Sequence, residues 1–258
     1  YANNAVECVL GKSVDYAFEG DLPFVESKFQ RHVCVMEFTG SWCAQCPDGA
    51  TVLNYLVDRQ YEGQVFALAF HNNDIYALEQ EQDLYKMFNW GGYPAYVTDM
   101  RDTGLLNEGG CDDSIEKSLN ESPTYCSVAV ESSYDAQTGQ AVLKARILSR
   151  KAMNYRIAAY VVEDKIKGEQ TLGTGQVKKD YTHRHVVRKM LSSNVRGDNM
   201  GEIKAGKESS KTFTFEVDEN WNLGNLSVAV LAIDNNGHVN NMAVCEVDGG
   251  KMDHEYVQ

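Results

Sequence analysis

Residues 33–50 read VCVMEFTGSWCAQCPDGA, and they hold the strongest pattern in the chain. The run 33–39 is continuously apolar and β-branched, which is typical of a short strand covered on both faces. A glycine and a serine end this run, and apolar side chains then recur at helical spacing over 47–61. The pair Cys43 and Cys46 is therefore expected where a buried strand turns into an amphipathic helix.

This position favours thiol–disulfide chemistry. Unpaired N–H groups and the positive end of a helix dipole meet at such a turn, and both favour a thiolate over a thiol. Two intervening residues keep both sulfurs within bonding reach. We expect Cys43 at the exposed tip, where it attacks a substrate disulfide, and Cys46 on the buried stripe, where it resolves the mixed disulfide.

Two further residues are candidates for this site. Glu37 is the lone carboxylate of the apolar run, and burial would raise its pKa and suit it to relay the proton that Cys46 loses. Tyr93-Pro94 opens a later strand, where a cis peptide bond would present backbone to a substrate. The alternatives are a satisfied buried carboxylate without a catalytic role and a trans proline at a sheet edge.

Strands and helices alternate outward from this stretch, which predicts βα units and a mostly parallel sheet. After about residue 123 the pattern changes to period-2 strands between turns, which predicts an all-β sandwich. Asn236-Gly237 suits a type I′ hairpin turn. We therefore expect an α/β domain over residues 1–123 and a β-sandwich-like domain over residues 124–258.

The motif MEFTGSWCAQCP (36–47), followed by helix, strand, helix and Gly-Tyr-Pro94, resembles the thioredoxin-like superfamily. The resemblance covers roughly residues 24–122, after an N-terminal extension and with an insertion near 72–82. It implies a central mixed sheet with flanking helices. It also implies these site residues: nucleophile Cys43, resolving Cys46, buried acid Glu37, cis-proline Pro94, and substrate contacts from Trp42 and Tyr93.

The whole chain resembles the 28-kilodalton outer-membrane-protein family of Gram-negative bacteria. The stretches YVVED (160–164) and YTHRHVVR (181–188) carry this second likeness. It implies an exported lipoprotein of the cell envelope, in the periplasm or at the outer membrane, and hence an oxidising compartment.

Two features of the motif depart from common redox proteins of the superfamily. The dipeptide Ala44-Gln45 is typical of neither reductants nor oxidants, so the direction of electron flow stays open. Pro47 has no N–H, so the carbonyl of Cys43 lacks its usual donor four residues along the helix. The helix is therefore expected to begin irregularly.

Composition excludes several classes of protein. The chain has 258 residues and a formal net charge of −13, which disfavours binding to nucleic acid. No apolar run approaches the roughly 20 residues of a membrane span, so membrane association is expected only through a lipid anchor. The partners expected are protein thiols and disulfides or another envelope protein. No cofactor is expected, because the two sulfurs carry the electrons.

Other readings of the cysteines and histidines remain open. The Cys43–Cys46 pair could be a structural disulfide on a non-catalytic envelope scaffold, or part of a metal site. His183 and His185 share one face of an extended chain and would suit a metal, although hydrogen-bonded packing explains them too. There are seven cysteines; Cys34 fits a buried apolar position, and a bond between Cys111 and Cys126 is conceivable.

Overall fold

The computed structural model describes residues 28–106 and 110–257, and most of its regular elements are strands. The largest sheet has nine strands in the order β14-β13-β7-β10-β2-β1-β3-β4, with β11 beside β7. Its first four strands along the chain are β1 (Val33–Thr39), β2 (Val65–His71), β3 (Ala95–Thr98) and β4 (Asp102–Leu105). The later ones are β7 (Met153–Glu163), β10 (Val186–Met190), β11 (Asp198–Ile203), β13 (Leu226–Ile233) and β14 (Val239–Glu246).

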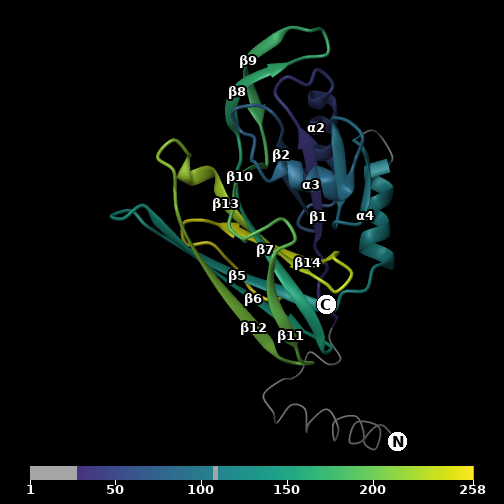
Figure 1. Cartoon of the computed structure of the whole chain (residues 1–258), viewed down its shortest axis with the longest axis vertical. Helices are drawn as coiled ribbons and strands as arrows, with labels where there is room; N and C mark the ends of the chain where they lie inside the picture. The colour runs from purple at the N-terminus through teal and green to yellow at the C-terminus, as the bar shows by residue number, and fades with distance from the viewer. Residues whose placement is uncertain (1–27, 107–109, 258) are drawn as a thin grey trace, which may run out of the picture.

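The predicted run 33–39 is a strand buried along its whole length, with β2 parallel on one side and β3 antiparallel on the other. Helices cover this part of the sheet (Figure 1). They are α2 (Cys46–Tyr55), which continues into the π-helical turn η1 (Leu56–Gln60), α3 (Glu81–Phe88) and α4 (Gly110–Glu121). The alternation of strands and helices over this region is as predicted.

Side chains of β1 alternate between two apolar clusters, as the pleat requires. Val33 and Val35 pack with α2, η1 and α4, whereas Met36 and Phe38 pack with α3 and strands of the C-terminal half. The same alternation places Glu37 on the face that α2 covers. A carboxylate thus enters the layer between β1 and the helix that carries Cys46.

A second sheet has four strands in the order β12-β6-β5-β15. It packs against the C-terminal strands of the large sheet, and both contribute to one apolar cluster. Its strands are β5 (Cys126–Asp135), β6 (Gln140–Ser149), β12 (Glu208–Glu216) and β15 (Lys251–Met252), and a 3-10 turn, η2 (Leu223–Asn225), precedes β13.

A separate two-stranded sheet is formed by β8 (Ile166–Thr171) and β9 (Val177–His183). It lies at one end of the molecule beside the start of α2, at the top of Figure 1. The sequence analysis did not predict this hairpin. Its strands are largely polar and exposed, so they lack the apolar alternation on which strand prediction depends.

Strands from both sides of residue 123 share the large sheet. β10 joins the two groups, because it is parallel to β2 and antiparallel to β7. The amide of Ala69 in β2 donates to the carbonyl of His185 at 2.7 Å. The two predicted regions are therefore continuous through backbone hydrogen bonds.

The turn type expected at Asn236-Gly237 was wrong. In the hairpin turn at 234–238 only Gly237 has a positive φ (+80°), whereas a type I′ turn needs two such residues. The amides of Asn236 and His238 bind the side chain of Asp234 instead, which stabilises a longer turn.

Cys111 and Cys126 are both buried and unbonded, as is Cys34, while Cys8 lies outside the described residues.

Candidate functional site

The Cys43–Cys46 pair lies in the turn between β1 and α2, and its two sulfurs form a disulfide. The amide of Cys43 donates to the carbonyl of Gly40, which tightens the turn. Gly40 is required here, because a Cβ at this position would lie 2.6 Å from Nε1 of Trp42. The indole of Trp42 donates to the carbonyl of Asn72 and remains 46% exposed beside the pair.

Cys43 is not at an exposed tip, which corrects the prediction from sequence. Only 5% of Cys43 is exposed, and Cys46 is buried as predicted. Strand β8, which is more than a hundred residues away in the sequence, lies against this turn. The amide of Thr171 donates to the carbonyl of Ser41 at 2.8 Å, and Gln170 Nε2 donates to the carbonyl of Cys43 at 2.9 Å.

Glu37 lies beneath the pair, as predicted. Its carboxyl group is buried, its Oε1 has no hydrogen-bond partner, and burial raises its pKa to about 8. Glu37 and Cys46 both line a cavity of about 20 Å³, with Tyr181 and His183 of β9 on the other side. A cavity of this size holds about one water molecule. A protonated carboxyl group thus lies close enough to the sulfur of Cys46 for a short proton relay.

Tyr93 and Pro94 lie beside the same turn. Their peptide bond is cis, as predicted, and Pro94 packs so closely on α2 that a Cβ at Gly49 would lie 2.8 Å from its Cγ. The ring of Tyr93 lies edge-on to that of Trp42, with centroids 5.5 Å apart. The structure therefore brings all six predicted site residues together.

A buried carboxylate that the sequence analysis missed fixes Tyr93. Its hydroxyl donates to Glu81, which also accepts from Asn72 Nδ2 at 2.9 Å. Burial and the Glu81 carboxylate raise the pKa of Tyr93 well above its ordinary value. No sequence signal marks Glu81, because an acidic residue in the first turn of a helix is common on exposed surfaces too.

Histidines pack at the base of the β8–β9 hairpin. His71 Nδ1 is 2.7 Å from Asp74 Oδ2, and the rings of His71, Tyr76 and His183 are in mutual contact. Burial and the neighbouring His71 lower the pKa of His183 to about 4, so its ring is neutral at pH 7. Within residues 28–106 and 110–257, no group of three or more His, Cys, Asp or Glu side chains is arranged to hold a metal ion.

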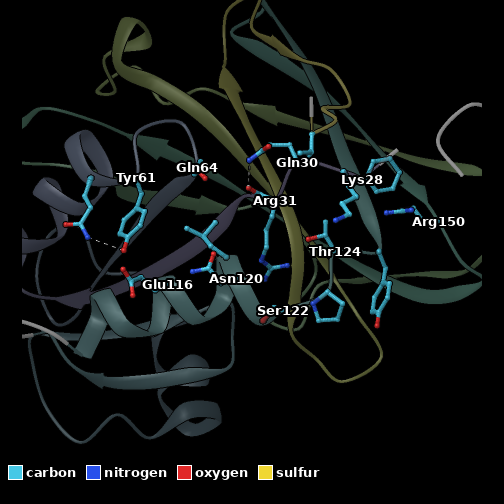
Figure 2. A pocket seen from close by; sticks show the side chains of 16 residues that line it. Lys28, Gln30, Arg31, Tyr61, Gln64, Glu116, Asn120, Ser122, Thr124 and Arg150 are labelled. Carbon is cyan, nitrogen blue, oxygen red and sulfur yellow. Dashed lines mark hydrogen bonds between the residues drawn. The ribbon is translucent and has the colours of Figure 1, made fainter. Parts of the chain in front are cut away.

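A groove of about 810 Å³ lies near the opposite ends of β1 and β2 (Figure 2). Its walls come from the segment before β1, the end of η1, the second half of α4 and the loop before β5. Arg31 in this groove is committed to the fold, because it donates to Asp99 and to the carbonyl of Asn240. The groove thus offers polar walls but is separate from the disulfide.

Comparison with known proteins places the chain among envelope proteins. The family Outer membrane protein Omp28 matches residues 81–252, which is more than half of the chain. The fold is similar to that of HBP35 of Porphyromonas gingivalis, with a TM-score of 0.72 and 19% identity over 86% of this chain and 77% of that one. A likeness at this identity shows the fold alone.

No curated protein matches the chain. None of the helices in the described part of the chain has the length and hydropathy of a membrane span. The family match agrees with the localisation expected from sequence, at the cell envelope. The chain belongs to the Omp28 family of outer membrane proteins.

Proposed function

We propose that this protein exchanges disulfides with envelope proteins through Cys43 and Cys46, on a thioredoxin-like unit that ends near residue 123. The order β1, α2, β2, α3 and β3, with a CxxC pair at the start of α2 and a cis-proline before β3, supports that assignment. The residues after 123 would position the partner. Through β8 they already contact the turn that holds Cys43 and Cys46, which we call the redox turn.

The disulfide form can oxidise a dithiol partner. A partner thiolate attacks Sγ of Cys43, a mixed disulfide forms, and the Cys43–Cys46 bond breaks with its electron pair on Cys46. Cys46 takes up a proton, which Glu37 can supply because its pKa of about 8 keeps it protonated at pH 7. The second partner thiolate then attacks the mixed disulfide, which leaves an oxidised partner and two reduced cysteines.

The reverse sequence reduces a partner disulfide. Cys43 attacks, and Glu37 in its ionised form accepts the proton that Cys46 loses before Cys46 attacks the mixed disulfide. Relative reduction potentials set the direction. The same groups serve both directions, so the roles assigned to the residues do not depend on the direction of exchange.

One observation carries the proposal: a buried carboxyl group, whose Oε1 has no hydrogen-bond partner, shares a cavity with Cys46. Burying a carboxyl group without hydrogen bonds destabilises a fold. A purely structural disulfide needs no such group, whereas a resolving cysteine needs a proton donor and acceptor. Glu37 therefore has a chemical use only if the disulfide opens and closes.

The test is to trap the mixed disulfide. Cys46→Ser leaves Cys43 able to attack but removes the residue that resolves, so envelope proteins should accumulate as thiol-reversible adducts on Cys43. Cys43→Ser is the matched control, and it should trap none or far fewer. Equal adducts on both variants, or none on either, would contradict the proposal.

The alternative is a non-catalytic envelope protein with a structural disulfide, and the burial of Cys43 favours it. A ligand would then bind elsewhere, for example in the polar groove of Figure 2. The two functions make opposite predictions in the trapping experiment. A structural disulfide gives no adducts on Cys46→Ser.

A further inference from the structure

The carbonyl of Cys43 is the starting point. In a regular helix this oxygen would accept from the amide of residue 47, but Pro47 has no N–H. Cys46 gives only a long contact of 3.3 Å from its amide. Gln170 Nε2, at 2.9 Å, supplies the missing donor. A side chain from β8 thus gives a donor to the turn that precedes α2.

Gln170 donates from Nε2 to the carbonyl of Cys43 at 2.9 Å and to that of Thr171, in its own strand, at 3.0 Å. It is 2% exposed, and its Nε2 also lies 3.3 Å from the carbonyl of Gly40. The neighbouring backbone amide of Thr171 donates to Ser41. Three carbonyls of the redox turn, those of residues 40, 41 and 43, therefore face two donors from β8.

Beyond its base, where His183 packs on His71 and Tyr76, the hairpin that provides these donors is largely exposed. It forms a sheet of its own, and residues 177–180 of β9 are all exposed. A two-stranded hairpin is marginally stable in water, so its docked position depends on its contacts with the body. At its base, Gly168 lies against the Tyr76 hydroxyl, and a Cβ there would be 2.1 Å from that oxygen. Gln170 and Thr171 make its contact with the disulfide turn.

We propose that the β8–β9 hairpin is an intramolecular cap that competes with polypeptide substrates for the Cys43–Cys46 turn. This inference rests on the proposed function for its biological meaning, but not for its geometry. In the docked state β8 is an extended chain that lies against the turn and donates hydrogen bonds to the turn's carbonyls. Cys43 becomes accessible when the hairpin moves away.

The substrate class follows from the same contacts. A partner that displaces the hairpin leaves the carbonyl of Ser41 without its donor and the carbonyls of Gly40 and Cys43 with one donor fewer. An extended polypeptide offers N–H groups at suitable intervals, so the capped site should select segments of protein chain that carry a cysteine. Small thiols lack most of these donors and would not compensate for the loss of the cap.

The test measures chemical access to the disulfide. Gln170→Ala removes the side-chain donor, and Gln176→Ala is the matched control, since Gln176 lies in the exposed loop of the same hairpin. Each protein is treated with a water-soluble phosphine under native conditions, and the new thiols at residues 43 and 46 are alkylated and counted by peptide mass spectrometry. Loss of one to two net hydrogen bonds predicts about tenfold faster reduction in Gln170→Ala. Gln176→Ala should match the wild type.

A second measurement separates cap opening from general unfolding. Hydrogen exchange in Gln170→Ala should accelerate in residues 166–183 and stay slow in β1 and β2. Thr171→Pro removes the other donor and should also speed reduction. Reduction of both variants within twofold of the wild type overturns the proposal, and so does faster exchange throughout the chain.

These readouts do not depend on catalysis. Faster reduction of Gln170→Ala together with no trapped partner would support the cap and contradict the disulfide-exchange function. Trapped partners together with an unchanged rate of reduction would support the exchange function and contradict the cap.

Discussion

At the scale of single residues, Glu37 explains most about the site. Its neighbours in β1 are apolar and fully buried, and its Oε1 has no hydrogen-bond partner within the described residues. Desolvation therefore raises its pKa from an ordinary 4.5 to about 8. An unfolded chain would ionise this group near pH 4.5, whereas the folded protein keeps it protonated until about pH 8.

The sign of the pH dependence follows from this difference. A raised pKa in the fold stabilises the protein fully below pH 4.5, and this contribution is lost as the pH rises towards 8. Glu37→Gln does not titrate, so its stability relative to the wild type should increase with pH. Between pH 4 and 7 the difference should grow by about 3 kcal/mol, measured by urea unfolding at each pH. A difference that stays constant over this range would show that Glu37 titrates normally.

Buried histidines give an opposite dependence at lower pH. Burial lowers the pKa of His183 and of His185 to about 4, against an ordinary 6.5. An unfolded chain takes up these protons first, so stability should fall as the pH drops from 6.5 towards 4. His183→Gln should flatten this part of the curve in urea unfolding. Identical slopes for His183→Gln and the wild type would contradict the assignment.

At the scale of elements, the pattern of apolar residues decided which strands could be predicted. β1, β2, β7 and β13 are rich in buried apolar residues, and the sequence marked all four. The hairpin β8–β9 and strand β11 were missed, because many of their residues are polar and exposed. Backbone ladders hold these strands in place, together with the few side chains that they bury.

Two glycines, one directly before β11 and one within it, show how backbone contact fixes such a strand. A Cβ on Gly197 would lie 2.8 Å from the backbone of Ile157, whereas nothing lies within 4 Å of one on Gly201. Both have positive φ, +76° and +71°. Gly201→Ala should therefore cost about 1 kcal/mol from strain alone, and Gly197→Ala about 3 kcal/mol, because backbone must also move. Equal losses of stability in chemical denaturation would rule out the close approach.

At the scale of the whole molecule, β14 binds segments that are far apart in the sequence. The side chain of Asn241 accepts from the amide of His32 and donates to the carbonyls of Gln30 and Cys126, each at 2.9 Å. Asn240 accepts from the amide of Tyr125 at 2.8 Å. These buried amides join β14 to the residues at the start of β1 and at the start of β5.

Removal of one such amide should weaken the entire fold. Asn241→Ala leaves buried N–H and C=O groups without partners and should cost about 3 kcal/mol. Asn235→Ala, in the exposed turn before β14, is the control and should cost less than about 0.5 kcal/mol. Tryptophan fluorescence and far-UV circular dichroism should report one coincident unfolding transition. Two separated transitions would contradict a single cooperative body.

The same scale explains which part of the site was predictable. Cys43, Cys46, Glu37 and Pro94 lie on or beside strands with strong local patterns, and the structure brings them together as predicted. The cover over Cys43 was not predictable, because the contact between Gln170 and Cys43 spans 127 residues. The only local hint was Pro47, which leaves the Cys43 carbonyl in need of a distant donor.

The reduction potential of the Cys43–Cys46 pair tests the central claim most directly. It can be measured by equilibrating the intact protein with glutathione buffers and counting thiols at residues 43 and 46 by peptide mass spectrometry. A disulfide that exchanges with partners should lie roughly between −270 and −120 mV. A value below about −300 mV would identify a structural bridge and contradict the account.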